Sequence, residues 1–196
     1  MPNVSHIMGL RPIEQPFGNI RCNFYEAATG LALYMYQPVD LNSSGRITVA
    51  GANSNNLIVG SIVGFADDSF CPLPNPYLAA NPGFGYTVNS AGLVKVLVAD
   101  DPNQHFVIEE DTGGTALDAQ SVGAGASFIY TATTGNTTSG VANAVLDRSG
   151  IDTGALQQFR LIKKWDKPDN AYGNWCKWVV KINLHRYTST TSGVLV

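Results

Sequence analysis

The acidic residues on either side of a predicted turn are the first group whose types and spacing could do chemistry. They are Asp100, Asp101, Glu109, Glu110 and Asp111. Two carboxyl groups that meet across a hairpin can share a proton, as in glycosidases, or bind Ca²⁺. Here the two aspartates stand in the turn, and the other three acids end the strand that follows it. We therefore interpret the group as turn-forming residues and solvated strand ends.

The three histidines show no spacing that would predict a catalytic or metal-binding site. His6, His105 and His185 are far apart, and none belongs to an HxH, HxxxH or HExxH pattern that would put two metal ligands on one face. A Ser-His-Asp triad can assemble from distant positions, but the GxSxG sequence of a nucleophile elbow is missing. We therefore predict a protein that is not an enzyme and has no cofactor and no metal. A hydrolase would need Asp or Glu close to His105 or His185 in one pocket.

The aromatic residues near the carboxyl end are the more serious candidates for function. Trp165, Tyr172 and Trp175 could form a platform on which sugar rings stack. Alternatively, Trp165 and Trp175 pack beneath loops or against a neighbouring subunit, while Trp178 belongs to the core. Packing is the favoured interpretation, because tryptophan commonly serves cores and interfaces.

These aromatic residues lie in a predicted hairpin that covers residues 156–187. On its second strand every other residue from Cys176 to Leu184 is apolar, and this period of two is typical of a half-buried strand. The same alternation places Trp175 and Trp178 on opposite faces of the strand.

Short apolar segments separated by Gly, Pro, Asn and Asp recur along the rest of the chain, with almost no helical periodicity. They predict strands at 20–25, 31–39, 47–50, 57–65, 93–99, 105–110, 127–131 and 142–147. Asp100-Asp-Pro-Asn has the residues of a tight turn, so it predicts a hairpin between 93–99 and 105–110. Ala116–Gln120 predicts one helical turn. The predicted fold class is all-β, an antiparallel β-barrel or β-sandwich with an extended N-terminal arm and long loops.

The predicted domain organisation is a β-rich body, residues 18–187, between an extended arm (1–17) and an extended tail (188–196). The body forms either one unit or two lobes, 18–70 and 85–187, joined by a proline-rich connector. The arm has five apolar side chains, and its prolines exclude a long helix. They are Ile7, Met8, Leu10, Ile13 and Phe17. Because these side chains need a surface against which to be buried, we expect the arm to reach a neighbouring subunit or a shell.

Composition narrows the class of protein. The 196 residues have a net charge of −3, which argues against a nucleic-acid or anionic-membrane partner. Only 14% of residues are charged, and a surface so poor in charge often meets partner proteins. The three cysteines form no CxxC pair and predict free thiols in a reducing compartment. The amino terminus lacks the features of a signal peptide and the longest apolar runs are too short for a membrane span, so we expect synthesis in a cytoplasm.

Three stretches of the chain together resemble one protein family. The first joins Gly18-Asn-Ile, Tyr25 and Gln37-Pro-Val to the apolar run 57–65. The second is 95–111 followed by Val122-Gly, and the third comprises 156–162, 168–173 and 179–187. Their order and spacing resemble the head decoration (cement) proteins of tailed bacteriophages over about residues 18–187.

The resemblance implies a viral structural protein that binds the outer surface of the phage capsid and stabilises the shell. Its implied partners are the major capsid protein of the same phage and further copies of itself, as a dimer or trimer, with no direct contact to nucleic acid or membrane. It implies synthesis in the host bacterial cytoplasm and a place on the outer capsid surface of the virion, and it supplies no catalytic residues.

The candidate capsid or subunit interface has two parts, the apolar residues of the arm and the aromatic residues of the hairpin. Its members are Ile7, Met8, Leu10, Ile13, Phe17, Trp165, Tyr172 and Trp175. A carbohydrate-binding β module on the virion surface is the main alternative function, and a hydrolase is the least favoured.

Overall fold

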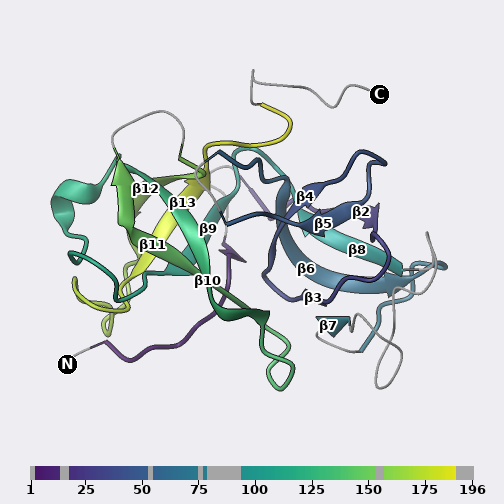
Figure 1. Cartoon of the computed structure of the whole chain (residues 1–196), viewed down its shortest axis with the longest axis horizontal. Coiled ribbons are helices and arrows are strands. Elements are labelled where there is room, and N and C mark those ends of the chain that lie inside the picture. Colours follow the sequence, from purple (N-terminus) through teal and green to yellow (C-terminus); the bar gives the residue numbers. More distant parts are fainter. Residues whose placement is uncertain are drawn as a thin grey trace.

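The computed structural model describes residues 3–13, 18–52, 55–74, 77–78, 94–152 and 157–188. In this part of the chain, antiparallel strands form two main sheets that lie side by side along the long axis of the molecule (Figure 1). Each sheet is the centre of one lobe, and we call these the first and the second lobe in chain order. The prediction of an all-β, antiparallel fold is confirmed. The one helical element among the described residues is a 3-10 turn, η1 (Ala119–Ser121), which overlaps the predicted helical turn.

The first lobe is built on a five-stranded sheet with the order β2-β8-β6-β4-β5. Its strands are β2 (Asn23–Glu26), β4 (Pro38–Leu41), β5 (Ile47–Val49), β6 (Gly60–Asp67) and β8 (Val94–Ala99), with a separate ribbon of β3 (Leu33–Tyr34) and β7 (Tyr77–Leu78). Alternate residues of β8, from Val94 to Val98, enter the core as a strand with one buried face requires. The sheet curls, so that Ala27 after β2 bridges Ile47 at the opposite edge.

The second lobe is built on a six-stranded sheet with the order β1-β9-β13-β12-β10-β11. Its strands are β1 (Arg11–Pro12), β9 (His105–Glu109), β10 (Gly125–Gly135), β11 (Ala142–Asp152), β12 (Phe159–Lys164) and β13 (Lys177–Ile182). This sheet also curls, as shown by the bridge between Glu110, which follows β9, and Leu146 of β11. The predicted C-terminal hairpin is confirmed, since β12 pairs with β13 from Phe159↔Ile182 to Lys164↔Trp178.

The predicted hairpin between 93–99 and 105–110 is wrong, because β8 and β9 belong to different sheets. The turn itself forms, with the Asp101 carboxylate accepting the Asn103 N–H at 2.7 Å. Asp100, however, points back to β2, where its carboxylate accepts both Asn23 Nδ2 and the Tyr25 hydroxyl. The turn therefore joins the lobes, and the division between the sheets lies at 100–104 and not in the proline-rich segment.

Apolar packing and polar clamps hold the two lobes together. Ala50, Ile58 and Ala99 of the first lobe share one buried cluster with Phe106 and Trp178 of the second. After β13 the chain returns to the first lobe, where the guanidinium of Arg186 forms a two-pronged ion pair with the carboxylate of Asp40. The Gln158 amide donates to the carbonyls of Gly51 and Asn56 at 2.9 and 3.1 Å. The lobes thus share a core as well as a boundary.

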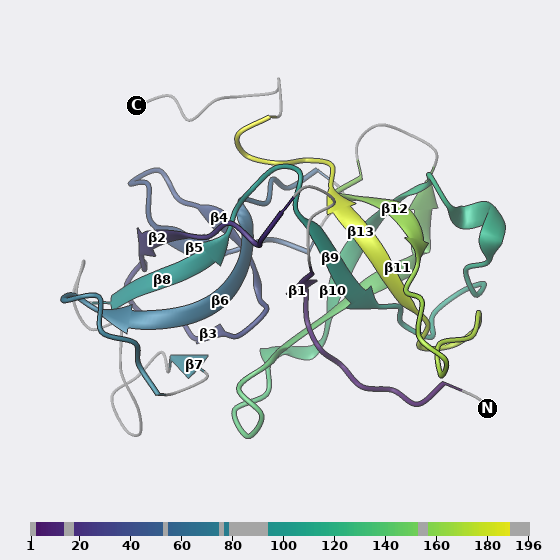
Figure 2. The same cartoon turned by 180° about the vertical axis from the view of Figure 1, so that it is seen from behind.

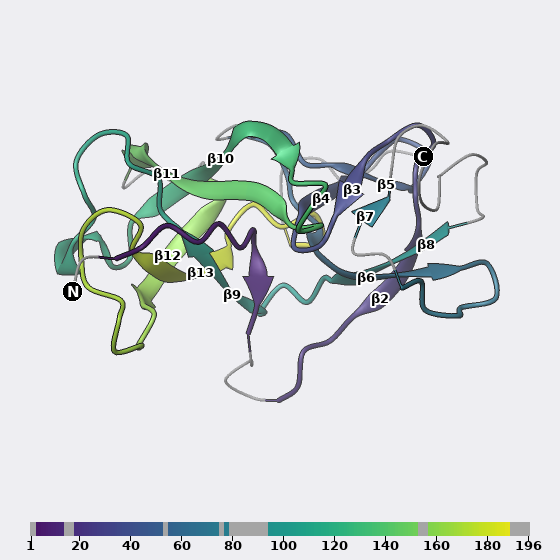
Figure 3. The same ribbon diagram turned by 90° about the horizontal axis from the view of Figure 1, so that it is seen from below.

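The described part of the N-terminal arm, residues 3–13, lies along the second lobe of its own chain (Figures 2 and 3). β1 pairs with β9, Leu10 is fully buried, and Met8 packs with Val107 and Val179. Leu10 also accepts a hydrogen bond from the Ser61 hydroxyl of the first lobe. We expected the arm to bury its apolar side chains on a neighbouring subunit or a shell, but Met8 and Leu10 are buried against the curled sheet of their own chain.

Candidate functional site

The predicted interface residues of the arm do not form an exposed surface. Met8 and Leu10 are buried, and Ile7 and Ile13 are partly buried. Ile13 packs on the small outer cluster around Val107 and Val179. Phe17 lies outside the described residues. The arm is therefore a strap, which the structure uses to cover its own sheet.

The predicted aromatic platform is not brought together in the structure. Trp165 packs on the outer face of β13, beside Val179, whereas Tyr172 contacts Trp178, which faces the core, with ring centroids 5.8 Å apart. The prediction that Trp175 and Trp178 occupy opposite faces of one strand is wrong. β13 begins at Lys177, and Trp175 lies in the preceding turn with a positive φ of 60°. Trp165 lines a surface hollow.

Glu110 is the centre of a buried polar network, so its interpretation as a solvated strand end is wrong. Its carboxylate is fully buried and accepts Trp178 Nε1 at 2.9 Å and Arg148 Nη1 at 3.3 Å. Burial raises the pKa of Glu110 to about 7, although Trp178 and Arg148 act in the opposite direction. Arg148 also donates to the carbonyls of Thr112 and Gly113. The network fixes the loop after β9, and its groups point into the core.

Glu109 and Asp100 are also buried, and each joins segments that are distant in the sequence. Glu109 accepts the Ser5 hydroxyl at 2.9 Å and the His6 N–H at 2.8 Å, and it pairs with Lys177, so it anchors the strap. Three of the five acidic residues in the predicted turn region thus hold the fold together.

The cluster at the lobe junction brings together Asp100, His185, Tyr25 and Tyr187. The two tyrosine hydroxyls lie 2.7 Å apart, and burial and Asp100 raise the pKa of Tyr25. The buried His185 accepts the Tyr187 N–H on Nδ1, and burial lowers the pKa of its ring. Among the described hydrogen bonds, none joins the Asp100 carboxylate to this histidine.

Three apolar residues on the outer face of the first lobe, two of them exposed phenylalanines, form what we call the aromatic patch: Phe24, Phe70 and Leu97. Phe24 of β2 stands opposite Leu97 of β8, and the rings of Phe24 and Phe70 meet edge to face with centroids 5.2 Å apart. Phe24 is 45% exposed and Phe70 is 56% exposed. Lys95 lies 6.0 Å from the Phe70 ring and pairs with Glu26 and Asp68, so charges of both signs border the patch.

The backbone of the β6 turn holds Phe70 in place at a conformational cost. Its φ is 62°, a left-handed conformation that a residue with a bulky side chain rarely adopts. The Asp67 carboxylate fixes the turn by accepting the N–H groups of Ser69 and Cys71, both at 2.9 Å. An exposed phenyl ring on a strained backbone is unusual, and such strain commonly marks functional positions.

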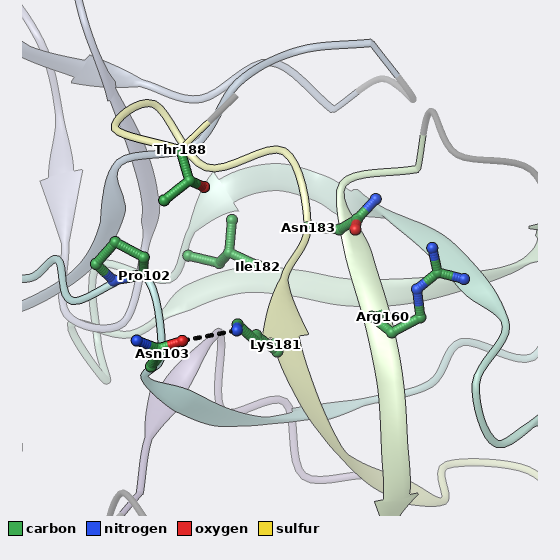
Figure 4. A pocket seen from close by; sticks show the side chains of 7 residues that line it. All are labelled: Pro102, Asn103, Arg160, Lys181, Ile182, Asn183 and Thr188. Carbon is green, nitrogen blue, oxygen red and sulfur yellow. Dashed lines mark hydrogen bonds between the residues drawn. The ribbon is translucent and has the colours of Figure 1, made fainter. Parts of the chain in front are cut away.

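A polar hollow of about 490 Å³ lies on the outer face of the second lobe (Figure 4). Its lining residues are Pro102, Asn103, Arg160, Lys181, Ile182, Asn183 and Thr188. Figure 4 shows Lys181 turned toward Asn103 on one side and Arg160 beside Asn183 on the other. Lys181 donates to the Asn103 amide oxygen at 2.8 Å. The hollow therefore presents two cations with neutral hydrogen-bonding groups between them.

The sequence patterns predicted neither the aromatic patch nor the polar hollow. Phe24 stands in an alternating segment, and alternation alone does not tell which face is buried. Phe70 follows Asp67-Asp-Ser, a turn signal that could have placed a phenylalanine in an exposed loop. The sequence does indicate a basic surface near the hollow, because six of the twelve lysines and arginines fall between 160 and 181.

The described residues contain neither a candidate metal-binding group nor a helix that could span a membrane. No group of three or more His, Cys, Asp or Glu side chains in these ranges is arranged to hold a metal ion. Within the same ranges, no helix has the length and apolar character that crossing a membrane requires. No family model matches the chain, and neither a curated protein nor a solved structure matches it.

Proposed function

We propose that this protein is a structural component of a tailed-phage virion that binds the outer surface of the capsid and stabilises the shell. The resemblance of residues 18–187 to head decoration proteins supplies the partner, the major capsid protein. The aromatic patch supplies the observation that carries the proposal. It is an exposed apolar centre with a charged border on one sheet face.

The composition of the patch is that of a protein interface. Such interfaces have a core of aromatic anchors surrounded by a polar rim, and a few anchors provide most of the binding free energy. Burying one phenyl side chain contributes about 1.5–3 kcal/mol. Phe70 is exposed although its backbone conformation is strained. This supports a role for its side chain in binding a partner, since the strain lowers the stability of the fold.

The test uses shells of the encoding phage that lack this protein, with binding measured by co-sedimentation. We expect Phe70→Gly to weaken binding by at least about tenfold, from the loss of one buried phenyl group. Glycine suits the φ of 62°, so this variant should be no less stable than the wild type in thermal unfolding. Bound wild-type protein should raise the temperature at which the shells open.

Tyr172→Ser is the matched control, because Tyr172 is 46% exposed on the other lobe. We expect it to bind shells as the wild type does. If Phe70→Gly binds normally while Tyr172→Ser does not, the contact lies on the second lobe. If the wild type does not bind or stabilise the shells, the proposed function is wrong.

A further inference from the structure

Five cations gather on the outer face of the second lobe, and we call this the basic face. They are Arg11, Arg160, Lys163, Lys167 and Lys181. The strand register explains the gathering: Arg160 of β12 stands opposite Lys181 of β13, which stands opposite His105 of β9. Residues opposite one another on adjacent antiparallel strands share a face. Three basic side chains therefore form a row across three strands.

Two of the three side chains in the row, Arg160 and Lys181, are cations that no carboxylate of the described residues pairs with. Lys163 pairs with the exposed Asp166 at 3.2 Å. Burial, then Lys181 and Lys163, lower the pKa of His105, as expected for a histidine surrounded by cations. Like charges directly opposite one another across strands are unfavourable. The protein has a net negative charge, yet it places mutually repelling cations on this face. Such a face is suited to an anionic ligand, which would relieve the repulsion.

Two hollows flank the row, and their linings indicate the kind of anion. The first is the polar hollow of Figure 4, whose lining includes the amides of Asn103 and Asn183 and the hydroxyl of Thr188. The Asn103 amide oxygen accepts Lys181, and the Asn183 amide donates to the Gln157 carbonyl at 2.9 Å. The second has a volume of about 500 Å³ and is lined by Arg11, Pro12, Ile13, Val107, Trp165 and Lys167. Lys167 lies 5.1 Å from the Trp165 ring. An indole wall, amides, a hydroxyl and cations are together the chemistry that recognises an acidic sugar.

We propose that the basic face binds an acidic polysaccharide chain of the uronic-acid type, with its carboxylates on the row and its sugar rings in the two hollows. A single-stranded nucleic acid fits less well, because successive bases need several stacking platforms, and Trp165 is the one tryptophan that lines these hollows. An acidic protein surface fits less well too, because it would not use two separate sugar-sized hollows. This site lies on the other lobe from the aromatic patch, so the two proposals succeed or fail independently.

The experiment titrates the full chain with oligogalacturonate at low and high salt and measures affinity by calorimetry. We expect binding to oligogalacturonate and none to neutral dextran, with affinity falling as salt screens the charges. Arg160→Gln together with Lys181→Gln should weaken binding by at least about tenfold, since two charge-assisted contacts are lost. Trp165→Phe should retain the fold and remove most of the fluorescence change that the ligand produces.

The matched control is Arg46→Gln together with Lys95→Gln, which removes the same two charges from the first lobe. We expect this variant to bind oligogalacturonate as the wild type does. The proposal is overturned if the control loses affinity equally, because net charge alone then explains binding. Equal or tighter binding of an oligothymidylate would overturn it in favour of a nucleic-acid site, and failure to bind oligogalacturonate at low salt would overturn it outright.

Discussion

At the scale of single residues, the buried carboxyl group of Glu110 sets a pH dependence. The group is protonated in both the folded and the unfolded chain at acidic pH, and ionised in both well above pH 7. Between 4.5 and about 7 the folded chain keeps the proton that the unfolded chain has lost, because burial raises the folded-state pKa. The free energy of unfolding contributed by this group therefore falls as the pH rises through that window.

We predict that Glu110→Gln removes this dependence. The difference in unfolding free energy between the wild type and the variant should shift by roughly 3 kcal/mol in favour of the variant from pH 4.5 to pH 7.5, at 1.36 kcal/mol per pKa unit. Urea unfolding at several pH values measures it. Stability curves for the two proteins that run parallel across the window would show that Glu110 is not the titrating group.

At the scale of elements, the strap of residues 3–13 is part of the fold. Leu10 is fully buried among residues of the main core, and its backbone N–H donates to the Tyr36 carbonyl at 2.8 Å. We predict that Leu10→Ala lowers the unfolding free energy by about 2–5 kcal/mol, as for other buried leucines. Val4→Ala is the control, since Val4 is 78% exposed and should have almost no effect. Equal, small effects in urea unfolding would mean that the strap detaches without loss of the fold.

Sequence patterns predicted the strands better than their pairing. Alternation located β8, in which every other residue from Val94 to Val98 is buried, and apolar content located β9 and β13, which are buried on both faces. The turn after β8 was recognised correctly, yet a local turn does not determine whether the strands beyond it meet, and Asp100 bound to Tyr25 directs them apart. The apolar residues of the arm were recognised as needing burial, but a pattern does not tell whether the covering surface belongs to the same chain.

At the scale of the whole molecule, the shared core makes the two lobes one cooperative unit. Ala50, Ile58 and Ala99 pack in the same cluster as Phe106 and Trp178, so neither lobe is complete alone. We predict a single calorimetric transition with a van't Hoff enthalpy equal to the calorimetric one. Arg186→Ala should lower the midpoint temperature of this transition, and the transition should remain single. Two resolved transitions in the wild type would show that the lobes unfold separately.

The candidate sites could be predicted only in part, because they depend on how distant segments meet. Trp165 was named from the sequence and does line a hollow. The basic row needed the register between β12 and β13, which sets Arg160 opposite Lys181. The aromatic patch needed more, since Phe24 comes from β2 and Phe70 from the turn after β6, and the left-handed conformation of Phe70 is one that its residue type disfavours.

The pairing of β1 with β9 has a consequence for synthesis on the ribosome. Among the described strands, β1 is made first, and those of the first lobe are all made before β9 appears. At a translation rate of about 5–20 residues per second, the emerging chain carries Met8 for roughly 5–20 s before a partner strand exists. A nascent chain that stalls before residue 105 therefore has the described strands of its first lobe, but it lacks β9, with which β1 pairs, and the residues of the second lobe that complete the shared core.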